Sequence, residues 1–283
     1  MIEFNKENVD IYVPENLELD AALERTTHLA IGAHQDDLEI FAYNGIAECY
    51  GTKEKWFSGV TVTNGAGSSR AGKYASFTDS EMQAVRYEEQ RKAAHLGNYS
   101  AMVQLSYSSA ETKDKESSDV INDLISVLHQ AKPEVVYLHN LADKHPTHVA
   151  TALRSIAAIR SLPAEQRPKK VYGCEVWRDL DWMDDSDKVA LSTSDAPNMA
   201  MALIALFDSQ VTGGKRYDLA TAGRRLANAT YFDANSADAD NSLSWAMDLT
   251  PLIEDNTLSI AEYVNEYIDR FKTDVNKNLI ALG

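Results

Sequence analysis

The chain has 283 residues and a formal net charge of −16 at pH 7, with 44% hydrophobic and 25% charged residues. These proportions are typical of a globular protein, and the acidic excess argues against nucleic acids and anionic membrane surfaces, which require a basic footprint. No apolar run approaches the roughly 18 residues of a membrane span. The acidic N-terminal segment also lacks a hydrophobic signal core, so we expect a cytoplasmic protein without membrane insertion.

Short apolar runs alternate with segments of helical periodicity along the chain. They predict strands at 27–33, 56–65, 101–107, 134–140 and 171–177, and helices at 39–51, 78–97, 119–131 and 146–160. Thr78 and Glu81 form a capping-box pattern, and Pro146 takes the first position of a helix, where its missing N–H costs little. Beyond residue 178 the less regular pattern predicts helices near 197–209 and 216–230, a strand at 243–249 and a terminal helix near 251–273.

Strands alternating with helices predict an α/β fold with a Rossmann-like, mostly parallel sheet and helices on both faces. Since no linker or repeat interrupts the chain, we expect one domain over residues 1–283, with a core at about 25–180 and an extension at about 181–283 that packs on it. The two cysteines, Cys49 and Cys174, form no CxxC motif and are expected to be reduced thiols.

The segment AHQDDLE, residues 33–39, directly follows the first predicted strand. Ligands of such folds bind beyond the carboxyl ends of the strands. Carboxylates this close repel one another and resist burial, so a bound cation would account for them. Asp37 and Glu39 also suit a helix N-terminus, but that role does not explain His34 beside two acids at a strand end.

A second histidine motif, HPTH at residues 145–148, follows the predicted strand 134–140. Loops after two parallel strands can converge at one edge of the sheet. Imidazole and carboxylate are usual ligands of Zn²⁺, and catalytic zinc sites combine three protein ligands with an open position. The two loops together therefore predict a metal site, and we assign no function to the remaining histidines: His28, His95, His129 and His139.

With these motifs in order, the chain resembles the PIG-L/LmbE-type zinc-dependent de-N-acetylases. The resemblance also includes VTNGAG (62–67) and RYEEQRKAAHLG (86–97), covers about the first 180 residues, and continues weakly through 204–218 and 245–252. It implies a hydrolase that removes the acetyl group from an N-acetylglucosamine conjugate. The implied cofactor is Zn²⁺, with another divalent ion left open.

The resemblance also implies roles for individual residues. By position, His34, Asp37 and His148 correspond to the zinc ligands, Asp36 to the general base and His145 to the residue that stabilises the oxyanion. Arg86 matches an arginine that contacts the substrate sugar, and Lys144 lies where some relatives carry a basic substrate contact.

Two positions depart from the family pattern. Gln35 replaces the usual proline, which we expect to change little, and Thr147 replaces the acid between the paired histidines. Because a nearby carboxylate favours imidazolium, we expect His145 to be less readily protonated here. The sequence does not show whether Asp143 substitutes for the missing acid. Thr147 in place of that acid predicts slower catalysis or a different substrate.

The loop NGAGSSRAGKY, residues 64–74, has one G-x-G but lacks the third glycine and the immediate helix of a dinucleotide fingerprint. We interpret it as a substrate-facing loop with Arg70 as a contact, while a plain surface loop is an equal alternative. Trp177 and Trp182 are candidates for a sugar-stacking wall, although tryptophan is more often a core residue.

Three function classes follow from the sequence. The first is a zinc-dependent deacetylase with a small amino-sugar substrate. The alternatives are a sugar-binding protein of the same fold with weak or lost catalysis, which Thr147 would suit, and a metal-free nucleotide-binding protein, which the glycine-rich loop would suit. The sequence leaves open whether the chain forms a homo-oligomer.

Overall fold

The computed structural model describes residues 2–283, and eight strands form its single sheet. The strand order is β1-β4-β3-β2-β5-β6-β8-β7. Strands β4, β3, β2, β5 and β6 are parallel to one another, whereas β1 pairs antiparallel with β4, β8 with β6, and β7 with β8. The strands are β1 (Asp10–Tyr12), β2 (His28–Gly32), β3 (Phe57–Thr63), β4 (Ala101–Tyr107), β5 (Val135–His139), β6 (Lys170–Cys174), β7 (Val189–Ser192) and β8 (Leu243–Asp248).

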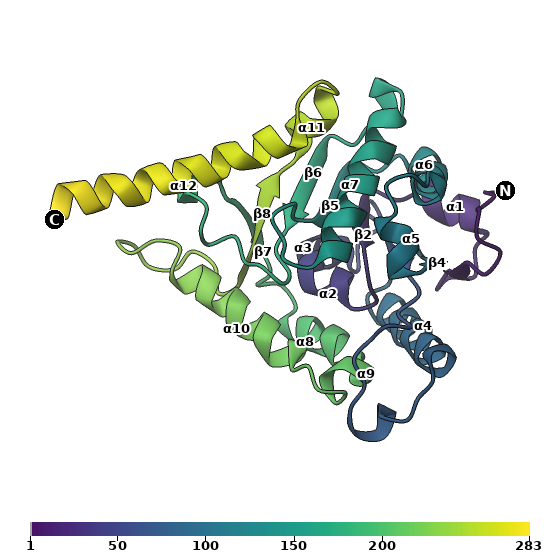
Figure 1. Cartoon of the computed structure of the whole chain (residues 1–283). Coiled ribbons are helices and arrows are strands. Elements are labelled where there is room, and N and C mark those ends of the chain that lie inside the picture. Colours follow the sequence, from purple (N-terminus) through teal and green to yellow (C-terminus); the bar gives the residue numbers. More distant parts are fainter. Residues whose placement is uncertain (1) are drawn as a thin grey trace.

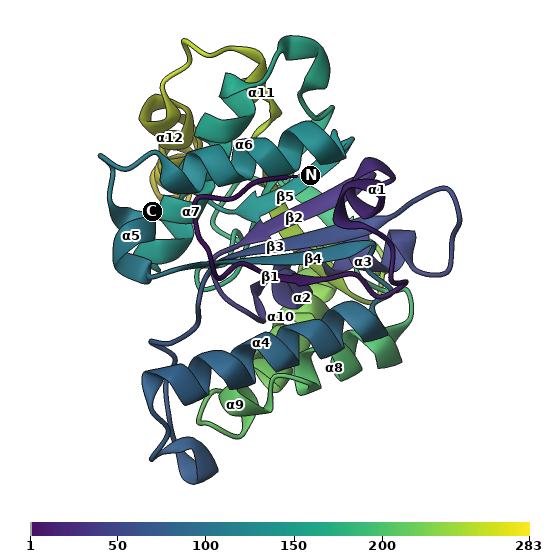
Figure 2. The ribbon, with the colours of Figure 1, turned by 90° about the vertical axis from the view of Figure 1, so that its right-hand side faces the viewer.

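Helices cover both faces of the sheet (Figures 1 and 2). Figure 2 shows α1, α6 and α7 on one face and α4, α8 and α10 on the other. The helices are α1 (Leu19–Glu24), α2 (Asp37–Phe41), α3 (Tyr43–Cys49), α4 (Asp79–Leu96), α5 (Ser109–Lys113), α6 (Asp119–Ala131), α7 (Pro146–Ser161), α8 (Pro197–Ala205), α9 (Asp208–Val211), α10 (Tyr217–Thr230), α11 (Thr250–Glu254) and α12 (Ile260–Leu282). Within residues 2–283, no helix is both long enough and apolar enough to cross a bilayer.

The central strands are buried along their whole length because helices cover both of their faces. Every residue of β2, β3 and β4 is buried, which is typical of parallel strands in α/β folds. One hydrophobic cluster packs between the sheet and helices that include α6 and α7, and a second packs beneath α2, α3 and α8. These two clusters fix the positions of the strand ends that carry the candidate site.

The strand order reverses between β2 and β5. From β2 the chain continues outward through β3 and β4, then returns to form β5 and β6 on the other side of β2. Ile31 lies beside Leu138 in the register, so the carboxyl ends of β2 and β5 are adjacent. A crevice at such a switch point is where open α/β sheets bind their ligands.

The predicted fold class is confirmed, and differences concern individual elements. The helix predicted at 39–51 is two helices, α2 and α3, which meet at Ala42. The terminal helix predicted near 251–273 is also two, because the turn at 255–259 separates α11 from α12. The helix predicted near 197–209 corresponds to α8 and the start of α9, and the sequence did not predict β1, α1, α5 and β7, all of six residues or fewer. Both cysteines are buried free thiols, as expected.

The capping box of α4 is present as predicted and offers a test of local stability. The Thr78 hydroxyl accepts a hydrogen bond from the Glu81 N–H (3.2 Å), and the Thr78 N–H donates to Glu81 Oε2 (2.8 Å). Thr78→Ala should lower the free energy of unfolding by about 1 kcal/mol, measured by urea denaturation. Thr78→Ser, which keeps the acceptor, should stay close to the parent. Equal losses in the two variants would contradict a capping role.

Candidate metal centre and active site

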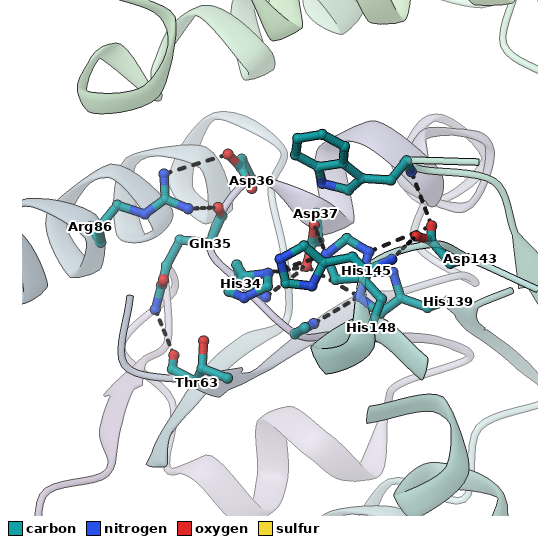
Figure 3. Close-up of polar contacts among 12 residues, drawn as sticks. His34, Gln35, Asp36, Asp37, Thr63, Arg86, His139, Asp143, His145 and His148 are labelled. Carbon is teal, nitrogen blue, oxygen red and sulfur yellow. Dashed lines mark hydrogen bonds and ion pairs between the residues drawn. The ribbon is translucent and has the colours of Figure 1, made fainter. Parts of the chain in front are cut away.

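Two loops at the switch point carry the candidate site. After β2 the chain turns through His34 and Asp36 into α2, and after β5 it runs to His145, which directly precedes α7. Figure 3 shows the side chains of both loops converging on one another. They line a cleft of about 810 Å³ together with residues 63–69 after β3.

Three predicted ligands bring their donor atoms together. His34 Nδ1 lies 3.2 Å from His148 Nε2 and 3.4 Å from Asp37 Oδ2, and His148 Nε2 lies 3.5 Å from Asp37 Oδ1 (Figure 3). In a tetrahedral zinc site with bonds of about 2.0–2.1 Å, neighbouring ligand atoms lie about 3.3–3.4 Å apart. The spacing of the three side chains therefore fits one zinc-sized ion.

His139, to which the sequence analysis assigned no function, also belongs to this cluster. The imidazole is fully buried, stacks on His148 with 3.9 Å between ring centroids, and places Nε2 3.1 Å from Asp37 Oδ2. The Ala33 N–H points at the same nitrogen (2.9 Å), so Nε2 either accepts from Ala33 or donates to Asp37. Either bond occupies Nε2, so His139 is less suited than His34 or His148 to bind an ion through that nitrogen. As the last residue of β5, it could have been found from its place at the strand end.

Two other sets of three side chains could hold a metal ion, because their ligand atoms lie within 4.8 Å of one another. One set is His34, His145 and His148, and the other is Asp37, His139 and His148.

Burial alone would raise the pKa of Asp37, but His148 and His139 outweigh it and hold that pKa well below its ordinary value. Burial lowers the pKa of His148 to about 4, so the imidazole is neutral and able to bind a metal.

Asp36 adopts a strained backbone conformation beside these ligands. Its φ of 94° lies in the left-handed region, which non-glycine residues rarely adopt. The Asp36 N–H donates to Gln90 Oε1 (3.2 Å), and the carboxylate faces Arg86 Nη1 at 3.4 Å. Burial raises the pKa of Asp36 to about 6; Arg86 opposes this shift and Asp37 adds to it. Strain of this kind is characteristic of functional sites.

Gln35 helps to hold this loop against the neighbouring strands. Its amide nitrogen donates to the Thr63 carbonyl (3.0 Å) and to Gln104 Oε1 (3.1 Å). A Cβ added to Gly65, which has a φ of 70°, would lie 2.5 Å from Gln35 Oε1. A glycine is therefore needed at the start of the loop after β3, and Gln35 supplies anchoring bonds that proline could not make.

His145 and Thr147 show what the missing family acid changes. Thr147 is buried, and Asp143 accepts from the His145 backbone N–H (2.8 Å) while lying 3.6 Å from His148 Nδ1. Asp143 therefore lies beside the His148 ring and forms no ion pair with the His145 ring. Burial, followed by repulsion from His34, lowers the pKa of His145, in the predicted direction.

Of the three predicted substrate contacts, Arg86 lines the cleft and Lys144 and Arg70 do not. Arg86 lines the cleft, and its guanidinium also donates to the Gln35 carbonyl. Lys144 is exposed, and Arg70 bonds to Asp79 (2.5 Å); neither is among the cleft-lining residues of the described chain. Trp177 lines the cleft as predicted, whereas Trp182 packs against the hydrophobic core.

The C-terminal part of the chain also lines the cleft, through Gln210, Lys215 and Tyr217. None of the three was predicted from the sequence. Their segments return to the site because β7 and β8 extend the sheet beyond β6, and such long-range pairing leaves no local signal.

Comparison with known proteins agrees with this geometry. Residues 29–159 match the PIG-L family, described as GlcNAc-PI de-N-acetylase. Residues 29–159 form a PIG-L domain. The uncharacterized deacetylase YaiS of Escherichia coli is 29% identical over 154 residues, which is 51% of this chain and 74% of that protein. The PIG-L domain carries both histidine motifs.

Solved structures share the fold at low sequence identity. The N,N′-diacetylchitobiose deacetylase of Pyrococcus horikoshii superposes with a TM-score of 0.63 at 16% identity, covering 86% of this chain and 90% of that one. GalB, a 4-carboxy-2-hydroxymuconate hydratase of Pseudomonas putida, gives 0.62 at 18% identity, covering 79% and 96%. Because two different reactions occur on this fold, the chemistry has to be argued from the site.

Metal binding distinguishes the groupings of ligands. If His34, Asp37 and His148 hold the ion, His34→Ala should abolish stoichiometric uptake of one Zn²⁺ per chain. His139→Ala should weaken affinity only about 10- to 100-fold, as expected for a residue that supports a ligand. Competition with a chromophoric chelator measures both affinities. His129→Ala, away from the cluster, is the control. A larger loss in His139→Ala than in His34→Ala would favour the set of Asp37, His139 and His148, and loss of uptake in His145→Ala as well as His34→Ala would favour the set of His34, His145 and His148.

Proposed function

We propose that the PIG-L domain is a zinc-dependent hydrolase that removes the acetyl group from an N-acetylated amino sugar. The observation that carries the proposal is the approach of His34 Nδ1 and His148 Nε2, which lie 3.2 Å apart, to the two carboxylate oxygens of Asp37 at 3.4 and 3.5 Å. A second buried acid, Asp36, lies in the same cleft. Family membership supports deacetylase chemistry, and the chitobiose deacetylase supports an acetylated amino sugar as the substrate class.

The metal, held by His34, Asp37 and His148, would acidify water and polarise the acetyl carbonyl. Asp36 is the residue proposed to accept the proton of the attacking water. Its carboxylate lines the cleft beside the ligands and faces Arg86, which fixes its direction. The proton can then pass from the Asp36 carboxyl group to the departing amine, so the carboxylate is regenerated when the product leaves.

His145 is proposed to donate a hydrogen bond to the oxyanion that develops on the acetyl carbonyl. Its ring lies in the cleft with 5.0 Å between its centroid and that of His34, and its Nδ1 has no hydrogen-bond partner among residues 2–283. A donor aimed at a developing oxyanion typically contributes about 3–4 kcal/mol. Because no carboxylate pairs with this ring, we expect its contribution to lie at the lower end of that range.

The cleft itself selects for a polar substrate. Ser68 and Ser69 of the loop after β3 line it, as do Trp177 and Tyr217. Aromatic rings together with hydrogen-bonding side chains suit a sugar ring, which presents an apolar face and a rim of hydroxyls. This combination also favours hydrolysis of a sugar amide over a purely structural role for the cluster.

Loss of Asp36 gives the sharpest test. With N-acetylglucosamine derivatives as substrates and release of free amine as the readout, Asp36→Ala should lower kcat by about 10²–10⁴-fold, because the proton acceptor is gone. Zinc content, measured in the same preparation, should remain at one per chain. Normal turnover in Asp36→Ala, or no chelator-sensitive amine release from the parent chain, would contradict the proposal.

A further inference from the structure

The peptide unit that joins Gln35 to Asp36 is held at both of its polar ends by α4. Arg86 donates through Nη2 to the Gln35 carbonyl (Figure 3), and Gln90 accepts a hydrogen bond from the Asp36 N–H through Oε1 (3.2 Å). Arg86 and Gln90 are both buried and lie four residues apart, which places them on the same side of the helix. These two side chains, which we call the α4 clamp, therefore fix the plane of this peptide.

The conformation of Asp36 explains why this peptide has to be held. Its φ of 94° is unfavourable for a residue with a Cβ, and such conformations persist only where the surroundings impose them. Rotation of the peptide plane would return φ to a negative value and break both bonds to α4. Because the direction of the Cα–Cβ bond depends on the backbone atoms around it, the carboxylate would then move from its place beside Arg86 Nη1 (3.4 Å).

Glu39 determines which way the Gln90 amide faces. Gln90 Nε2 donates to Glu39 Oε1 (2.8 Å), and the Tyr99 hydroxyl donates to the same oxygen (2.7 Å). All three side chains are fully buried, where unpaired polar groups are costly. With its nitrogen toward Glu39, Gln90 presents its oxygen to the Asp36 N–H, which can only donate. The opposite orientation would place two donors together at Asp36.

Glu39 and Tyr99 are themselves held by neighbouring elements. Arg225 of α10 is buried and donates through Nη2 to the carbonyls of Glu39 and Ile40 (2.9 Å each), near the end of α2. The Tyr99 ring packs so closely on Gly97 that a Cβ added there would lie 2.5 Å from Tyr99 Cε1. The orientation of the Gln90 amide is therefore set by a buried network that joins α2, α4, α10 and the turn after α4.

We propose that Gln90 is a positioning residue of the reaction, which acts with Arg86 to hold the peptide between residues 35 and 36 and so keeps the Asp36 carboxylate directed into the cleft. Glu39 supports this role by orienting the Gln90 amide. Neither Gln90 nor Glu39 is among the cleft-lining residues of the described chain, so both act through Asp36. The inference rests on the proposed function, because it takes Asp36 to be the proton acceptor.

Exchange of the two side chains tests the clamp by kinetics. Gln90→Met should lower kcat for amine release about 10- to 100-fold with little change in KM, because Asp36 is displaced while the cleft is intact. Zinc content should stay at one per chain. Gln90→Glu, which brings two carboxyl groups together, should cause a similar loss. The double variant Gln90→Glu, Glu39→Gln restores one donor and one acceptor and should recover most of the activity.

Gln130→Met is the matched control. Gln130 is a half-buried glutamine on α6 that donates to the Asp20 carbonyl and to Glu24, so the variant loses comparable bonds away from the cleft and should match the parent in kcat. An unchanged kcat in Gln90→Met, or a loss in Gln90→Glu that the double variant does not recover, overturns the positioning role.

A second measurement does not depend on activity. Crystal structures of the parent chain and of Gln90→Met should show φ of residue 36 changing from its parent value of 94° to a negative value, with the carboxylate displaced from Arg86. A positive φ retained in Gln90→Met overturns the clamp. Absence of amine release from the parent chain would contradict the deacetylase proposal instead, and the conformation of residue 36 would still decide whether Gln90 holds it.

Discussion

The site depends on one buried carboxylate, Asp37, which has imidazole nitrogens from His34, His139 and His148 within 3.5 Å. Burying this charge would be costly without partners. The three rings come from the loop after β2, the end of β5 and the start of α7, so their contacts with this carboxylate connect the two strand ends where the sheet changes direction. A metal at the same position would neutralise the acid further, and the geometry of the cluster already matches that need.

Asp36 and Asp37 are adjacent in sequence, but their environments pull their pKa values in opposite directions. Asp37 faces imidazoles, which stabilise its charge, whereas burial dominates at Asp36 and raises its pKa to about 6. The positive φ of Asp36 makes this separation feasible, because it turns the side chain toward Arg86 on α4 and away from the histidines. Two acids with separated pKa values can divide the work of metal binding and proton transfer.

The sequence predicted the parts of the site that lie at the ends of parallel strands. His34, Asp37, His145 and His148 follow β2 and β5, and adjacency of those strands brings them together. Lys144 and Arg70 were expected in the cleft, but the direction of a loop side chain depends on local turns and partners such as Asp79, which spacing does not reveal. Tyr217 was missed for a different reason. Its place in the cleft follows from the pairing of β7 with β8 and of β8 with β6. Hydrophobic periodicity in the sequence does not predict which strands pair.

Two parts of the chain, the PIG-L domain and the segments that follow it, line the cleft together. The metal ligands and Asp36 lie within residues 29–159, the PIG-L domain, whereas Trp177, Lys215 and Tyr217 lie outside it. Asp143 connects the two parts, since its Oδ2 accepts from the Trp177 N–H (3.0 Å) and lies 3.6 Å from His148 Nδ1. The proposed ligands and the aromatic wall of the cleft therefore come from different parts of the chain and share one contact, the Asp143 carboxylate. If the proposed function holds, substitutions in the wall would alter the shape of the cleft while leaving the ligands in place.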